Sequence, residues 1–138
     1  MILAFFAVAI VPAGQLFRCT PVRVWDGDGP VWCAEGPRVR LAGIAAREID
    51  GSCRRGQPCP MVSGIAARDA LVALLGGPLG RTRAGHVLVR GPVLQCRSAG
   101  PGKGDRTAAR CLLPSGESLG CALVRRRVAL AWRRFGGC

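Results

Sequence analysis

The stretch from Val22 to Glu48 constrains the fold more than any other part of the chain. Apolar and polar residues alternate on both sides of Asp26-Gly27-Asp28-Gly29, and such alternation indicates half-buried strands. Asp-Gly pairs favour tight turns, because glycine adopts positive φ and aspartate hydrogen-bonds to the nearby backbone. A second break comes at Glu35-Gly36-Pro37, and a third apolar segment, Val39–Ile44, leads to the glutamate. The stretch therefore predicts three consecutive strands followed by an acidic loop.

Asp26, Asp28 and Glu48, three of the eight acidic residues of the chain, lie at the predicted turn and in the predicted acidic loop. The predicted strands would gather them beside Arg40. Carboxylates next to an arginine suit a site that holds a hard cation and a phosphate together. A D-G-D-G turn is also common in antiparallel sheets that have no active site, so the turn alone does not decide the function.

The longer pattern, V-x-D-G-D followed by R-V-R-L-A-G-I-x-x-x-E, resembles the staphylococcal nuclease (thermonuclease) family. Position by position, the resemblance implies a divergent exported member of bacterial type. It implies that Asp28, with Asp26 beside it in the turn, binds calcium. It further implies that Arg40 binds the scissile phosphate and that Glu48 is the general base and a metal ligand.

The chain departs from that family in the loop before the glutamate. The family reads D-x-P-E where this chain reads Ala45-Ala46-Arg47-Glu48, so a second calcium carboxylate is absent. We expect a weakened calcium site, with the Ala46 carbonyl or water filling the gap. Arg47 replaces a proline, and its cation could pair with Asp28 or Glu48. The chain also has no tyrosine, whereas the family lines its nucleotide pocket with tyrosines.

A second phosphate-binding arginine is predicted near position 106. The segment Gly104–Ala109 resembles the G-R-x-L-A segment of the family, in which an arginine contacts the transferring phosphate. Arg106 is the match, and Arg110 is its rival. His86 is the one histidine of the chain and is assigned no role, because a lone histidine before a strand is more often structural than catalytic.

Hydrophobic periodicity predicts five strands and two helices in a single domain, residues 17–138. The expected strands are Phe17–Trp25, Pro30–Ala34, Val39–Ile44, His86–Cys96 and Arg106–Leu113, and the expected helices are Val62–Leu75 and Ser118–Ala131. Arg97–Asp105 reads as a mobile loop. This order suits an α+β fold, a five-stranded OB-type Greek-key barrel with two helices packed on it. That fold is also the one that the resemblance implies.

Eight cysteines in so short a chain predict disulfides, which in turn indicate an oxidising compartment. They are Cys19, Cys33, Cys53, Cys59, Cys96, Cys111, Cys121 and Cys138. No two are spaced C-x-x-C, which disfavours a zinc site. Eight cysteines allow 105 pairings. We favour four, each joining segments expected to lie close together: Cys19–Cys33, Cys53–Cys59, Cys96–Cys111 and Cys121–Cys138.

Residues 1–16 are predicted to be a signal peptide or an N-terminal apolar segment. Ile2–Val11 is almost continuously apolar, and small or aliphatic residues follow at a plausible cleavage site. No positive residue precedes the run, so an apolar strand of the mature protein is the alternative. The run is too short for a normal membrane span. We therefore expect an exported monomer, periplasmic or secreted, without a stable membrane span.

The net charge of +12 points to a polyanionic partner. All but one of the 20 basic residues are arginine, whose guanidinium matches phosphate bidentately. The leading hypothesis is a metal-assisted phosphodiesterase that hydrolyses DNA, RNA or both, with no small-molecule cofactor. The alternative is a catalytically impaired OB-fold module that binds nucleic acid or another polyanion. A structural or protein-interaction role is the third hypothesis.

Overall fold

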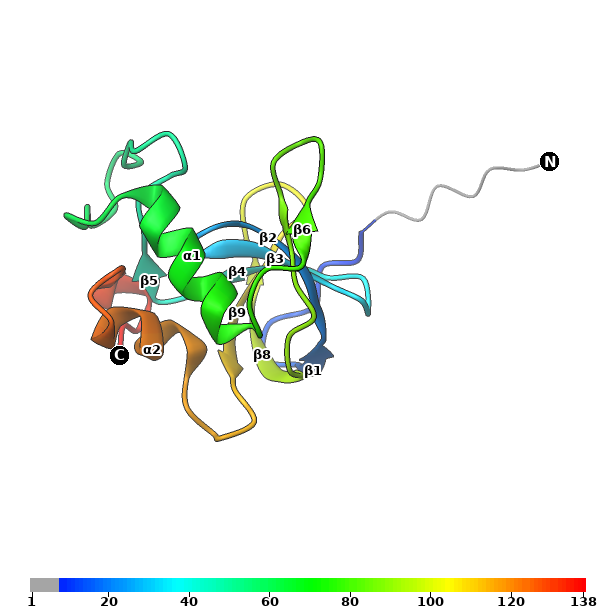
Figure 1. Cartoon of the computed structure of the whole chain (residues 1–138). Helices are drawn as coiled ribbons and strands as arrows, with labels where there is room; N and C mark the ends of the chain where they lie inside the picture. The colour runs from blue at the N-terminus through cyan, green and yellow to red at the C-terminus, as the bar shows by residue number, and fades with distance from the viewer. Residues whose placement is uncertain (1–7) are drawn as a thin grey trace.

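The protein is described by a computed structural model that covers residues 8–138 (Figure 1). The first seven residues of the predicted signal segment lie outside this range, so that hypothesis stays a prediction. Val11 is bound to the domain, since its N–H donates to Thr107 Oγ1 at 3.1 Å and its carbonyl accepts from Ser98 Oγ at 2.7 Å. The apolar segment therefore packs on the sheet from Val11 onward.

Ten short strands and two α-helices make up the described chain, with a final 3₁₀ turn, η1, at Arg133–Phe135. The strands are β1 (Leu16–Cys19), β2 (Pro21–Asp26), β3 (Gly29–Cys33), β4 (Arg38–Leu41), β5 (Ile44–Ala45), β6 (Gly80–Arg81), β7 (Val87–Leu88), β8 (Leu94–Pro101), β9 (Thr107–Leu112) and β10 (Leu130–Ala131). The helices are α1 (Gly64–Leu74) and α2 (Leu119–Arg125).

Eight of the strands form one open mixed sheet in the order β1-β8-β9-β4-β3-β2-β7-β6, and β5 pairs with β10 separately. The prediction of a closed five-stranded OB-type barrel is therefore wrong, although the α+β class with two helices holds. The physical reason lies in β2, which pairs with β3 on one side and with β7 on the other. Both edges of β2 are thus occupied, and the sheet ends at β1 and β6.

The strand boundaries differ from prediction at three breaks. Thr20 divides the expected first strand into β1 and β2, and the Ala42-Gly43 turn divides the third into β4 and β5. Gly91-Pro92 divides the fourth, because proline has no N–H for the ladder. The predicted loop at Arg97–Asp105 is in part a strand, since β8 continues to Pro101 beside β9.

Each helix is preceded by a serine that caps it. Ser63 Oγ accepts from the N–H of Ala66, and Ser118 Oγ accepts from the N–H of Cys121, so each satisfies one free N–H of a first turn. The second helix is shorter than predicted: α2 ends at Arg125, and the chain turns through Arg127, at φ 61°, into β10. The pairing of β10 with β5 replaces the last helical turn.

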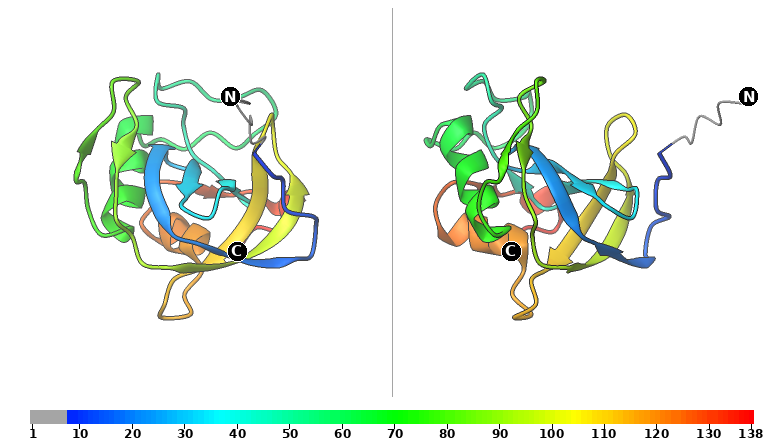
Figure 2. Two further views of the ribbon diagram at one scale, coloured as in Figure 1. Left: turned by 90° about the vertical axis from the view of Figure 1, so that its right-hand side faces the viewer. Right: turned by 45° about the vertical axis from the view of Figure 1, so that its right-hand side comes forward.

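The core lies between the sheet and the helices, which sit side by side on one face of the sheet (Figures 1 and 2). Its members are apolar side chains that are almost fully buried. They include Val24, Val31, Val39, Leu41 and Leu94 from the strands and Leu71, Leu75, Leu119 and Leu123 from the helical segments. The helices therefore hold in place the turns and loops that carry the acidic residues.

All four predicted disulfides are confirmed. Cys19–Cys33 joins β1 to β3, Cys96–Cys111 joins β8 to β9, Cys53–Cys59 closes a surface loop, and Cys121–Cys138 ties the C-terminus to α2. Crosslinks of this kind contribute about 2–4 kcal/mol each. Four of them fit a protein of an oxidising compartment.

Within residues 8–138, neither helix has the length and apolar character needed to cross a membrane.

Candidate active site

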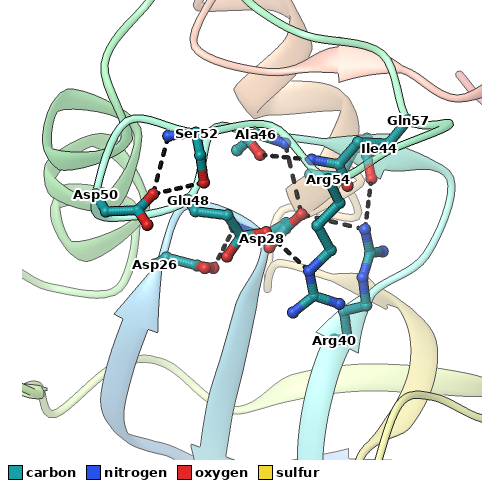
Figure 3. Close-up of polar contacts among 10 residues, drawn as sticks. All are labelled: Asp26, Asp28, Arg40, Ile44, Ala46, Glu48, Asp50, Ser52, Arg54 and Gln57. Carbon is teal, nitrogen blue, oxygen red and sulfur yellow. Dashed lines mark hydrogen bonds and ion pairs between the residues drawn. The ribbon is translucent and has the colours of Figure 1, made fainter.

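The structure brings together the three carboxyl groups that the sequence singled out (Figure 3). Asp26 ends β2, Asp28 lies in the turn to β3, and Glu48 follows β5. Asp26 and Asp28 are buried, with 4% and 6% of their surface exposed. The Asp28 N–H donates to Asp26 Oδ1 at 3.4 Å, so the turn itself orients the pair.

Two glycines let the helix and the acidic loop approach this turn. A Cβ at Gly27 would lie 2.5 Å from Ala67 Cβ in α1 and 3.0 Å from Ala46 Cβ. A Cβ at Gly64, the first residue of α1, would lie 1.8 Å from the Glu48 carbonyl oxygen. No ordinary side chain fits at either position. The placement of Glu48 therefore depends on backbone packing against α1.

Asp26 lies in an environment that disfavours its negative charge. Burial raises its pKa to about 10, and the neighbouring Asp28 and Glu48 carboxyl groups act in the same direction. Hydrogen bonding with those two carboxyl groups raises the pKa of Asp26 further. Three acidic side chains are thus held close enough to repel one another when ionised.

Arg40 is fixed against this cluster by three contacts. Its Nη2 lies 3.1 Å from Asp28 Oδ2 and 3.3 Å from the Ile44 carbonyl, and its Nη1 donates to the Leu41 carbonyl at 2.7 Å. The side chain is mostly buried, with 17% exposed. Arg40 therefore lies beside the carboxylates, as predicted from its position as the first residue of R-L-A-G-I.

Arg54, not Arg47, is the arginine that pairs with the glutamate. Arg54, in the disulfide-closed loop, places Nε 3.1 Å from Glu48 Oε1. Arg47 instead turns away, because its Nε donates to the Pro60 carbonyl and its Nη1 to the Gly51 carbonyl, each at 2.6 Å. The expectation that Arg47 pairs with Asp28 or Glu48 is therefore wrong. It holds the 51–60 loop in place.

A hollow of about 490 Å³ adjoins the carboxylate cluster, and we call it the arginine hollow. Its lining has five basic side chains and no acidic one: Arg40, Arg54, Arg55, Lys103 and Arg110. Trp132 and Phe135 supply an aromatic wall, with their ring centroids 4.7 Å apart. Arg40 and Arg54 belong both to this hollow and to the ion pairs with the carboxylates. The hollow is suited to an anion that carries an aromatic group.

The two candidates for the second phosphate arginine lie in different places. Arg106 does not line the arginine hollow but a separate one, together with Trp25 and His86. Arg110 does line the arginine hollow, yet its guanidinium donates to the Phe135 and Gly137 carbonyls. The structure thus brings Arg40 and Glu48 into one cluster and leaves Arg106 outside it. The phosphate role of Arg106 stays a prediction.

The donor chemistry of the cluster fits a hard divalent cation, because all three side chains offer carboxyl oxygens. The fit is partial. Asp28 Oδ2 is engaged by Arg40, Glu48 Oε1 is engaged by Arg54, and the Ala46 carbonyl accepts from Gln57 Nε2 at 3.4 Å. In the part of the chain that the structure describes, no three His, Cys, Asp or Glu side chains form a ready metal cluster. The remaining carboxyl oxygens of Asp26, Asp28 and Glu48 would hold the cation.

No protein-family model matches the chain, and comparisons with curated proteins and with solved structures found no significant match. The site must therefore be interpreted from its own geometry.

Sequence reasoning missed the most prominent feature of the site, the basic lining of the hollow. Arg54, Arg55 and Lys103 were assigned no role from the sequence. The disulfide between Cys53 and Cys59 brackets both loop arginines. A small closed loop that carries two adjacent arginines beside the acidic segment was the signal that could have identified them.

Proposed function

We propose that the protein is a phosphodiesterase that binds nucleic acid in the arginine hollow and hydrolyses it at the carboxylate cluster. One observation carries the proposal: Arg40 and Arg54 belong to both places. A phosphate that binds to these two guanidinium groups would lie next to Glu48. Arginine binds phosphate bidentately, and preorganised cations stabilise the charge that grows on the phosphate oxygens in the transition state.

Glu48 is the candidate general base. It would take a proton from a water molecule as the water oxygen forms a bond to phosphorus, while the bond from phosphorus to the leaving sugar oxygen breaks. The leaving oxygen would then receive a proton from solvent. In the free protein Arg54 neutralises Glu48, so a substrate phosphate that competes for Arg54 would release the carboxylate for this step.

Asp26, Asp28 and Glu48 would hold a calcium ion through the carboxyl oxygens that Arg40 and Arg54 leave free. A bound calcium ion would supply positive charge against the phosphate. Without it, Asp28 keeps Arg40 in place through the 3.1 Å ion pair. Because Ala45 offers no carboxylate, calcium would bind more weakly than in the thermonuclease family that the sequence resembles.

The alternative is a module that binds nucleic acid without cutting it, and one observation favours it. Asp28 and Glu48 each already carry an arginine partner, an arrangement that is stable without a metal ion. Under either proposal the net charge of +12 drives binding to the phosphate backbone. Under either proposal the four disulfides fit a periplasmic or secreted location.

Cleavage of nucleic acid by the oxidised protein tests the two proposals. Single-stranded and duplex DNA and RNA would be incubated with calcium, and separately with EDTA. The phosphodiesterase proposal predicts calcium-stimulated cleavage. Salt-sensitive binding with no cleavage under any condition would support the binding module, and the absence of both would contradict the two proposals together.

A further inference from the structure

A row of alternating cationic and aromatic side chains crosses the sheet away from the carboxylate cluster. Strand pairing sets Arg23 opposite Trp32 on one side and Arg38 opposite Trp32 on the other. The guanidinium carbons of the two arginines lie 4.0 and 3.9 Å from the centroid of the indole ring. Such contacts hold both cations in fixed positions at the sheet surface.

This row borders a second hollow, of about 290 Å³, which we call the tryptophan hollow. Trp25, Trp32 and His86 form its ring-bearing wall, with the His86 ring 5.0 Å from Trp25 and 5.3 Å from Trp32. Arg38 and Arg106 supply its cations. Aromatic faces beside arginines are the combination that binds a stacked base and its phosphate.

The charges of the tryptophan hollow leave a net attraction for an anion. Asp105 also lines it, and its carboxylate pairs with Arg38. Within the described residues, the Arg106 side chain makes no hydrogen bond or ion pair, so its guanidinium is available to an anion in this hollow. His86 carries no negative charge that would repel an anion. Burial, together with the neighbouring Arg23 and Arg38, lowers the pKa of its imidazole.

The two hollows are connected through one strand. Arg38 and Arg40 are two residues apart in β4, so they point to the same face of the sheet and their Cα atoms are roughly 7 Å apart. Arg38 lines the tryptophan hollow and Arg40 lines the arginine hollow. A flexible polyanion that passes along β4 would contact both in succession.

We propose that the tryptophan hollow is a second nucleotide subsite for single-stranded nucleic acid. A base stacks on Trp25 and His86, and Arg38 and Arg106 hold a phosphate of the strand whose neighbouring nucleotides occupy the arginine hollow. The subsite rests on the proposed nucleic-acid function and extends it. It makes the protein prefer single strands longer than a dinucleotide, because a short ligand fills one hollow only.

Added charge tests the subsite without removing any packing. Ala84 lines the tryptophan hollow and is exposed, so Ala84→Glu places a negative charge there. Ala66→Glu makes the same change on an exposed position of α1, outside both hollows. Binding of an oligothymidylate and of a thymidine dinucleotide would be measured in EDTA by fluorescence anisotropy.

We expect Ala84→Glu to weaken oligothymidylate binding at least tenfold more than Ala66→Glu does, while the two variants bind the dinucleotide alike. Equal effects of both variants on the oligonucleotide would overturn the subsite but leave the proposed function standing. Failure of the wild-type protein to bind either ligand would overturn both.

Tryptophan fluorescence gives a second, independent measurement. The chain has three tryptophans, and Trp132→Phe leaves only Trp25 and Trp32, both in the tryptophan hollow. The oligothymidylate should quench the emission of this variant, and the midpoint of quenching should equal the midpoint of an anisotropy titration of the same variant. Unchanged emission at saturating oligonucleotide would contradict the stacking of a base in this hollow.

Discussion

Replacing Gly64 by alanine should displace the acidic loop from helix α1. A Cβ at this position would lie 1.8 Å from the Glu48 carbonyl oxygen, 2.5 Å from its carbonyl carbon and 3.0 Å from the Arg47 carbonyl oxygen. All three are backbone atoms, which cannot rotate aside. Because real Cβ contacts are essentially never shorter than 3.0 Å, the Glu48 backbone must retreat by about 1.2 Å.

That retreat has consequences for stability and for the site. Glu48 anchors a tight turn, in which its N–H donates to the Ser52 carbonyl and its carbonyl accepts from the Gly51 N–H, both at 2.9 Å. Overpacking of this kind costs about 1–3 kcal/mol. A shift of about 1 Å in a reacting group lowers a rate by up to roughly 10²-fold. Helix propensity acts in the opposite direction, since alanine is better than glycine by at most about 1 kcal/mol.

Urea unfolding and cleavage rate would be measured for Gly64→Ala, with Ala66→Ser as the control. The control adds one atom to an exposed position in the same turn of α1. We expect a lower unfolding midpoint and a lower rate for Gly64→Ala alone. A Gly64→Ala variant that is more stable than wild type would refute the reasoning. It would show that the added Cβ does not force the Glu48 backbone away from α1, so that the gain in helix propensity prevails.

The remaining predictions concern the loop, the metal site and pH. Arg47→Ala should speed trypsin cleavage in the 51–60 loop, because it removes both contacts that hold the loop, and an unchanged digestion rate would argue against this role. Ala45→Asp should tighten calcium binding, as measured by calorimetry, because the next residue, Ala46, has its N–H 3.5 Å from Asp28 Oδ2. An unchanged calcium affinity would contradict the view that the calcium site lacks only a carboxylate at position 45. The pKa of His86 is lowered from 6.5 by burial and by two arginines, so the unfolded chain takes up the proton first and the free energy of unfolding should fall as the pH drops below about 6.5. His86→Gln should abolish that part of the pH dependence, as measured by urea unfolding at several pH values.

Local patterns in the sequence predicted the elements and crosslinks well. The expected helices were found in place, and three of the disulfides were indicated because each joins two cysteines of one hairpin or loop. Cys121–Cys138 was the remaining pair, and it ties the C-terminus to α2. The sheet topology was not predictable in the same way. It depends on which edges of β2 remain free, and the β6–β7 hairpin that occupies one of them has only two residues in each strand.

The candidate site was predictable to the extent that its residues follow one another in the sequence. Asp26, Asp28, Arg40 and Glu48 lie on successive strands and turns, so the chain itself brings them together. Arg54 could not be assigned to Glu48 by the same logic, because the path of the 51–60 loop is set by Arg47 and by a disulfide. Long side chains on irregular segments can reach several partners, and only the folded geometry selects one.

The cleavage rates of two site variants test the central claim most directly. Oxidised wild-type protein, Glu48→Gln and Arg40→Ala would be compared on single-stranded DNA and RNA in calcium, with Arg126→Ala as a control for the loss of one exposed positive charge. We expect wild type and the control to cut alike and each site variant to lose roughly 10²–10³-fold in rate. Site variants that cut as fast as the control would contradict hydrolysis at this cluster.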